Sequence, residues 1–261
     1  MKEFLGIGGY TRIPEGAYSW QHLTFVFVLM GLMIFLAVFL GLRYRNKDDK
    51  TKNKVIIAAA ILIDAIEIFK LVVFCVRGNG IAELRTNLPL FLCSIQLIAI
   101  PLAAFTKGRV KEASTDFVFI FGILSGMMGI IGAAQNFNAY PVLGIDNMAS
   151  GLTHSIAGFA SLYIGVSGSA SMKKKNIPFT YGIFVFFMGL AFLANTLLDY
   201  NYMFLRTPDG TPYQIFYNLV GGNPVIYPMI VIGLFLAYIA VFYLVFLAIK
   251  KKRLQKEAIS G

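Results

Sequence analysis

The chain has 261 residues and a formal net charge of +10, and 57% of its residues are apolar while only 14% are charged. This apolar fraction excludes a soluble domain, because a domain of this size could not bury so many apolar side chains. The basic residues alternate with apolar runs and form no stripe interleaved with aromatic residues, which argues against a nucleic-acid partner. The composition therefore predicts an integral membrane protein whose main partners are membrane lipids.

Seven runs of roughly 20 apolar residues follow one another, each long enough for a hydrocarbon core of about 30 Å. They lie near residues 20–42, 55–76, 87–106, 116–135, 148–170, 178–199 and 226–249. The predicted fold class is all-α, a polytopic membrane bundle of about seven transmembrane helices in a single domain, 1–261. The loop before the last run contains a Thr207-Pro208-Asp209-Gly210 turn, and we expect an interfacial anchor or a lid there.

Lysine and arginine gather in alternate connections between these runs. The connections after the first, third, fifth and seventh runs hold 17 of the 23 basic residues. The positive-inside rule then places the N-terminus outside and the C-terminus in the cytoplasm. We expect a bacterial plasma membrane, with anionic lipid head groups near the basic loops.

Cysteine and histidine are scarce. The two cysteines, Cys75 and Cys93, and the two histidines, His22 and His154, form no CxxC or HxxxH pattern. We therefore expect no metal and no other cofactor. A disulfide between Cys75 and Cys93 is an alternative to two free thiols.

Three charged residues share one face of the second run at i, i+3 spacing: Asp64, Glu67 and Lys70. Each charge near mid-membrane costs about 2.5–3.5 kcal/mol, so this face must turn toward the bundle interior. A Glu67–Lys70 ion pair or partners on other helices would offset part of that cost. The cluster is either a structural polar network or a substrate, ion or proton site.

Uncommon polar side chains recur toward the outer ends of several runs. At a rise of about 1.5 Å per residue, Lys70, Cys93, His154 and Asn195 all lie about 7–10 Å below the outer ends. Glu67 is one turn deeper. We predict a polar chamber in the outer half of the bundle, with Lys70, Gln96, Gln135, Asn195, Asp199 and Arg206 as binding residues.

A thiol and an imidazole in this layer suggest nucleophilic chemistry. Cys93 would be the nucleophile, His154 the base that removes its proton, and Glu67 or Asp199 the group that orients the imidazole. The alternatives are an inert buried cysteine and a histidine that only hydrogen-bonds a neighbouring helix.

Glycines recur at helical spacing in the fourth and fifth runs. They are Gly122, Gly126, Gly129 and Gly132, then Gly151, Gly158 and Gly165. Small residues at these spacings predict close packing between transmembrane helices.

Several segments resemble a known family. Leu88-Pro89-Leu90-Phe91-Leu92-Cys93-Ser94-Ile95, Gly151-Leu152-Thr153-His154, and Asn201-Tyr202-Met203-Phe204-Leu205 after an Asn195-bearing run are similar to the bacterial YwaF-like integral membrane proteins, over roughly 20–245. That family is distantly similar to eukaryotic membrane proteins implicated in acyl transfer to ether-type phospholipids through a cysteine. The resemblance implies a lipid acyltransferase.

The chain departs from that resemblance at two positions. Phe91 stands where the family pattern has histidine, and Leu90 stands where the eukaryotic relatives carry their reactive cysteine. The family's residue roles can therefore be assigned to His154 and Asn195 more directly than to Cys93.

Three functions fit these features. The first is an enzyme, with thiol- or histidine-dependent acyl transfer on membrane lipid. The second is a small-solute or ion transporter that uses Asp64, Glu67 and Lys70, although no inverted repeat is visible. The third is a non-catalytic membrane scaffold. The oligomeric state is left open.

Overall fold

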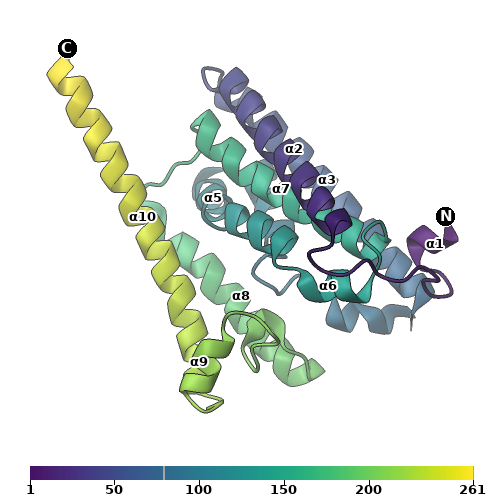
Figure 1. Cartoon of the computed structure of the whole chain (residues 1–261). Coiled ribbons are helices and arrows are strands. Elements are labelled where there is room, and N and C mark those ends of the chain that lie inside the picture. The colour runs from purple at the N-terminus through teal and green to yellow at the C-terminus, as the bar shows by residue number, and fades with distance from the viewer. Residues whose placement is uncertain (79, 261) are drawn as a thin grey trace. The chain divides into compact units, whose positions relative to one another are not determined.

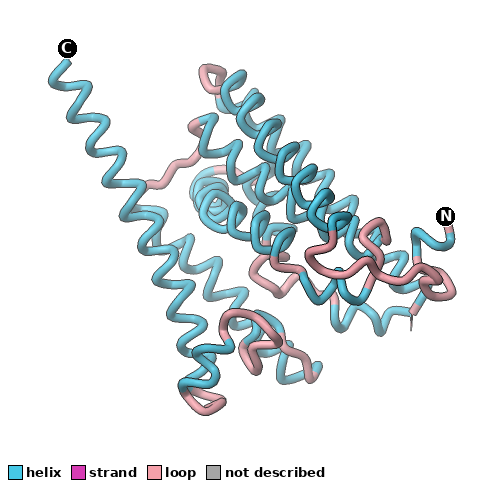
Figure 2. Tube along the Cα trace, viewed as in Figure 1, coloured by secondary structure: helices cyan, strands magenta, loops and turns pink. Residues whose placement is uncertain are grey.

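The structure is a computed structural model that describes residues 1–78 and 80–260, without the side chains of 253, 254 and 256–260. Within this part of the chain the regular elements are helices, and none is a strand (Figures 1 and 2). In chain order they are α1 (Lys2–Leu5), α2 (Trp20–Tyr44), α3 (Asp49–Arg77), η1 (Gly80–Thr86), α4 (Gln96–Phe105), α5 (Gly108–Ile131), α6 (Ala134–Ala139), α7 (Ile145–Ser167), η2 (Lys174–Asn176), α8 (Ile177–Leu198), η3 (Tyr202–Phe204), α9 (Gln214–Leu219) and α10 (Ile226–Ser260). The all-α prediction is confirmed.

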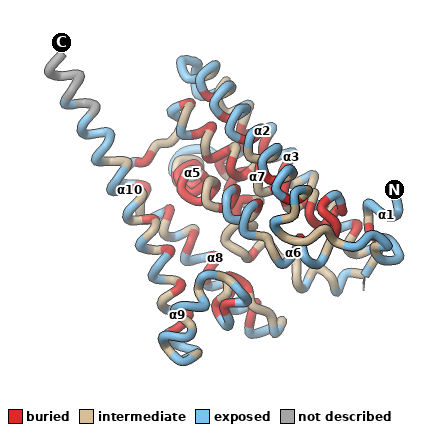
Figure 3. The backbone as a smooth tube through the Cα atoms, in the orientation of Figure 1, coloured by how far each residue is buried: buried red, intermediate tan, exposed pale blue. Residues whose placement is uncertain are grey.

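The chain divides into two compact units, Met1–Ser171 and Met172–Gly261. In the first unit α7 packs against α2, α3 and α5, while α4 packs against α3 and α5. The buried positions of this unit are most numerous along α5 and α7 (Figure 3). These two helices therefore form its core.

In the part of the chain that the structure describes, four segments are long and apolar enough to cross a membrane: Trp20–Tyr44, Gly108–Ala139, Lys174–Leu198 and Ile226–Lys252. The count of seven is not confirmed. Helices α3 and α7 have sufficient length, with 29 and 23 residues. However, α3 carries the three charges of the Asp64 face, and α7 is rich in serine, threonine and glycine. The orientation of the termini stays a prediction.

The prediction of one continuous helix over 87–106 is wrong. Helix α4 covers only its second half and has ten residues, too few to cross the hydrocarbon core. The preceding segment is held by local turn bonds, such as Ile95 N to Phe91 O at 3.1 Å and Gln96 N to Cys93 O at 3.2 Å. Pro89 has no N–H to contribute to a helix, and hydropathy alone does not reveal such a break.

The predicted close packing of glycines is confirmed between α5 and α7. A Cβ on Gly122 would lie 2.6 Å from the carbonyl oxygen of Ala157, and one on Gly126 would lie 2.9 Å from the Cα of Gly158. Ser161 on α7 also donates a hydrogen bond to the carbonyl of Phe119 on α5, at 2.7 Å. The two backbones approach because no side chain separates them.

In the second unit α8 packs against α10, and the Thr180 and Tyr243 hydroxyls lie 2.9 Å apart. The predicted turn after α8 is present: Asp209 and Gly210 both have positive φ, and Thr211 N donates to Pro208 O at 2.9 Å. Helix α9 follows this turn.

Candidate functional site

A small pocket lies in the first unit between α3, the segment that leads into α4, α5 and α7. Its volume open to water-sized molecules is about 50 Å³, enough for a few waters. The residues that line it are Ile63, Glu67, Lys70, Cys93, Ser94, Leu97, Ser125, Ser150, Thr153 and His154. The pocket thus brings together the predicted nucleophile, the predicted base and two charges of the Asp64 face.

His154 is held by its own helix. Its Nδ1 lies 2.7 Å from the carbonyl oxygen of Ser150, one turn earlier on α7. A carbonyl only accepts, so Nδ1 carries the proton in this hydrogen bond. Nε2 is then the unprotonated nitrogen and is left for another partner.

The ring of His154 also depends on a glycine. A Cβ on Gly129 would lie 1.7 Å from Cδ2 and 2.2 Å from Nε2 of the imidazole. The ring therefore lies directly against the backbone of α5. The atoms nearest to the missing Cβ of Gly129 all belong to this ring, so the glycine leaves space for the His154 side chain.

Cys93 lies in the irregular segment just before α4, where it lines the same pocket as His154 and interacts electrostatically with its imidazole. Its Sγ is 4.0 Å from the hydroxyl oxygen of Ser94. Both cysteines are free thiols, so the Cys75–Cys93 disulfide is not formed. Irregular backbone at membrane depth is tolerated where it is buried in protein or lines a cavity, and this segment does line one.

Glu67 and Lys70 form the ion pair that the sequence suggested. Lys70 Nζ lies 2.7 Å from Glu67 Oε1, and the side chains are only 15% and 13% exposed. Lys70 also interacts electrostatically with His154. Asp64 is half-buried on the same helix but does not line the pocket.

Neither carboxylate proposed to orient His154 occupies the Nδ1 position. That place is taken by the Ser150 carbonyl, while Glu67 pairs with Lys70. Asp199 lies in the second unit, where it accepts a hydrogen bond from Arg206 at 2.5 Å on the surface.

The other expected binding residues do not line the pocket. Gln96 follows Cys93 by one turn and is fully buried, and its amide atoms have no hydrogen-bond partner. Gln135 is exposed on α6. Asn195 stabilises the loop after α8: it donates to Tyr202 O at 3.0 Å and accepts from Tyr202 N at 2.5 Å.

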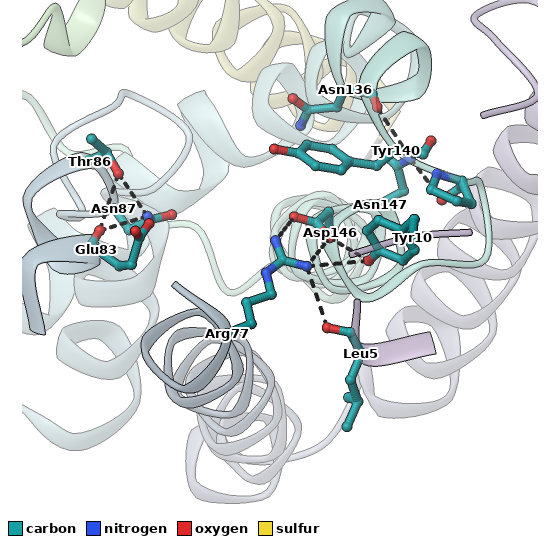
Figure 4. Close-up of polar contacts among 11 residues, drawn as sticks. Leu5, Tyr10, Arg77, Glu83, Thr86, Asn87, Asn136, Tyr140, Asp146 and Asn147 are labelled. Carbon is teal, nitrogen blue, oxygen red and sulfur yellow. Dashed lines mark hydrogen bonds and ion pairs between the residues drawn. The ribbon is translucent and has the colours of Figure 1, made fainter. Parts of the chain in front are cut away.

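A second buried polar group joins α3, α7 and the N-terminal tail, and we call Arg77, Asp146, Tyr10 and the Leu5 carbonyl the Arg77 cluster (Figure 4). Arg77 donates two hydrogen bonds to the Asp146 carboxylate, one of them at 2.7 Å from Nη1 to Oδ2. Tyr10 donates to the same carboxylate at 2.6 Å. Burial, and then the bond to Asp146, raise the pKa of Tyr10 to about 12.

Sequence reasoning missed the hydroxyls of the pocket and the whole Arg77 cluster. The spacing Ser150-x-x-x-His154 does place the two residues one turn apart, and Ser125-x-x-x-Gly129 does the same on α5. These spacings were the available signal. For Arg77 and Asp146 there was none, because 69 residues separate them.

No curated protein and no solved structure matches this chain. The profile of the TMEM164 family matches residues 17–256, which is nearly the whole chain. The chain therefore belongs to the TMEM164 family and is an integral membrane protein.

Proposed function

We propose that this protein is a membrane-lipid acyltransferase in which Cys93 carries the acyl group and His154 transfers the protons. The observation that supports this most is that one pocket brings together Cys93 and an imidazole whose Nδ1 is fixed by the Ser150 carbonyl. A nucleophile, a base and a group that orients the base form the constellation that covalent catalysis requires.

In the first half-reaction the Cys93 thiol gives its proton to His154 Nε2. The sulfur then attacks the carbonyl carbon of an acyl ester, so that a C–S bond forms and the ester C–O bond breaks. The departing alcohol oxygen takes the proton from Nε2. The products are a thioester on Cys93 and a lysolipid.

In the second half-reaction an acceptor hydroxyl loses its proton to Nε2 and attacks the thioester carbonyl. The C–S bond breaks, and the thiolate recovers the proton from His154. Helix α4 begins at Gln96, three residues after Cys93, which supports this role because a helix N-terminus stabilises nearby negative charge.

The finer features of the proposal come from the sequence. From the sequence we also propose that the protein is YwaF-like and that it spans a bacterial plasma membrane seven times, with its N-terminus outside. Lys70 would bind the polar part of the lipid, since it lines the pocket and carries a positive charge. Glu67 would hold Lys70 in place through the ion pair. Binding roles for Gln96, Gln135, Asn195, Asp199 and Arg206 are part of the same prediction.

The test uses purified full-length protein in mixed micelles with a phospholipid that carries a fluorescent acyl chain. We expect Cys93→Ala and His154→Gln to lower acyl transfer by about 10²-fold or more. Cys75→Ala is the matched control, because Cys75 is the other free thiol and does not line the pocket. Parental acyl transfer by the Cys93→Ala variant would exclude the mechanism.

The interrupted backbone before α4 also favours a second candidate, a transporter. Broken helices beside charged residues form many solute sites in transporters, and Glu67 and Lys70 lie beside this break. Proteoliposomes loaded with a pH-sensitive dye would show solute-coupled proton flux that Glu67→Gln abolishes. Flux that persists in this variant would exclude the ion pair as the coupling site.

A further inference from the structure

Ser125 on α5 has a hydroxyl that the fold leaves without a partner. The residue is 6% exposed, its Oγ has no hydrogen-bond partner, and it lines the pocket with Cys93 and His154. A buried hydroxyl without a hydrogen bond is unfavourable, and such a group calls for an explanation.

The other hydroxyls of the pocket wall are engaged. Thr153 donates to the Ser150 carbonyl at 3.0 Å, the Ser150 hydroxyl lies 3.4 Å from His154 Nδ1, and the Ser94 hydroxyl contacts Cys93 Sγ. Among the described residues that line the pocket, Ser125 is thus the hydroxyl that remains available to a ligand.

The helix places this hydroxyl beside the reacting groups. Ser125 precedes Gly129 by four residues, so the two share one face of α5 and their Cα atoms are about 6 Å apart along the axis. Gly129 is the position against which the His154 ring lies. The Ser125 face of α5 is therefore the face that His154 and Cys93 share.

We propose that Ser125 is a catalytic residue that donates its O–H to the carbonyl oxygen of the acyl group during attack by Cys93. This inference rests on the proposed acyl transfer. As the C–S bond forms, the electron pair of the carbonyl bond moves to oxygen, and the Ser125 hydroxyl donates a hydrogen bond to that negative oxygen. The bond is released when the carbonyl re-forms and the alcohol leaves.

The experiment measures formation of acyl-Cys93 in a single turnover by intact-protein mass spectrometry, with the fluorescent-acyl phospholipid as donor. Removal of one oxyanion donor costs about 10²–10³-fold in rate, so we expect Ser125→Ala to acylate about 10²-fold more slowly. Ser125→Thr, which keeps the hydroxyl, should recover most of the rate.

Ser114→Ala is the matched control. Ser114 lies on the same helix, three turns before Ser125, and its fully buried hydroxyl is also unpartnered, but it does not line the pocket. Its replacement should leave acylation unchanged. The alkylation rate of Cys93 by iodoacetamide should be the same in the parent and in Ser125→Ala, because alkylation forms no oxyanion.

Parental acylation by Ser125→Ala would overturn this assignment, and so would an equal loss of acylation and alkylation, which indicates a collapsed pocket. A comparable loss in Ser114→Ala would overturn it as well. Failure of the proposed function looks different, since acyl transfer would then survive Cys93→Ala.

Discussion

The Arg77 cluster and the pocket both lie between α3 and α7 in the first unit, and they differ in how completely their polar groups are hydrogen-bonded. In the Arg77 cluster the guanidinium and the carboxylate of Asp146 bond each other twice, and Tyr10 and Leu5 add further bonds. In the pocket a hydroxyl has no partner, the backbone is irregular and space remains open. Polar groups whose hydrogen bonds are all made within the protein hold helices together, whereas polar groups that lack a hydrogen-bond partner are available to a ligand.

The largest expected effect is a loss of stability when the Arg77 cluster is disrupted. Arg77→Ala leaves the Asp146 carboxylate, which is 6% exposed, without its counter-charge. Removal of one partner from a buried ion pair costs about 3–5 kcal/mol, and we expect a loss of about this size in the free energy of unfolding. Thermal and denaturant unfolding in detergent measure it.

Arg206→Ala is the matched control for that variant. It breaks an arginine–aspartate pair of 2.5 Å whose side chains are 50% and 89% exposed. Exposed pairs contribute about 0–1 kcal/mol, so little should change. Equal losses in the two variants would contradict the structural role given to the Arg77 cluster.

The second expected effect concerns the pocket, where a substitution should lower acyl transfer more than it lowers stability. In Gly129→Ala the new methyl group would overlap the His154 ring, with 1.7 Å to Cδ2. The imidazole must move, so acyl transfer should fall by at least about 10-fold, while overpacking costs about 1–3 kcal/mol of stability. Activity and unfolding are measured on the same preparation.

Gly31→Ala tests whether any helical glycine gives this result. A Cβ at Gly31 on α2 would meet no atom within 4 Å. Because alanine favours helix over glycine by up to about 1 kcal/mol, this variant should be as stable as the parent or more so, with full activity. If Gly129→Ala also kept full activity, the position of His154 would be irrelevant to function.

The smallest effect is a pH dependence in the Arg77 cluster. The pKa of Tyr10 is about 12, above its ordinary value near 10, so its contribution to stability is complete below pH 10 and is lost as the pH rises toward 12. Tyr10→Phe removes this titration. The difference in unfolding midpoint between parent and variant should therefore shrink between pH 9 and pH 11.5, and a constant difference would show that the tyrosine proton is not linked to folding.

The sequence predicts those helices and helix contacts that are determined by residues close together in the chain. Hydropathy over 20 residues locates α2 and α10, and glycine spacing predicts the contact between α5 and α7, because both depend on near neighbours in the chain. The break before α4 was not predictable in this way. Its residues are as apolar as those of a continuous span, and the turn is stabilised by backbone bonds that hydropathy does not register.

In the candidate site, too, the features set by neighbouring residues were predictable and those set by the tertiary fold or the backbone were not. The Glu67–Lys70 pair follows from i, i+3 spacing, and it forms. The group that fixes His154 is a backbone carbonyl, which no residue type reveals, so the sequence suggested carboxylates instead. The Arg77–Asp146 pair joins distant parts of the chain and needs the folded structure to be seen.

The most direct test of the account is the reactivity of the two thiols at pH 7. Iodoacetamide labelling followed by peptide mass spectrometry compares Cys93, which lines the pocket together with His154, with Cys75, which does not. We predict that Cys93 reacts at least about 10-fold faster, because the imidazole in the same pocket can remove the proton from its thiol. His154→Gln should lower the Cys93 rate to that of Cys75. Equal rates in the parent, or a Cys93 rate unchanged by His154→Gln, would contradict a reactive cysteine–histidine pair.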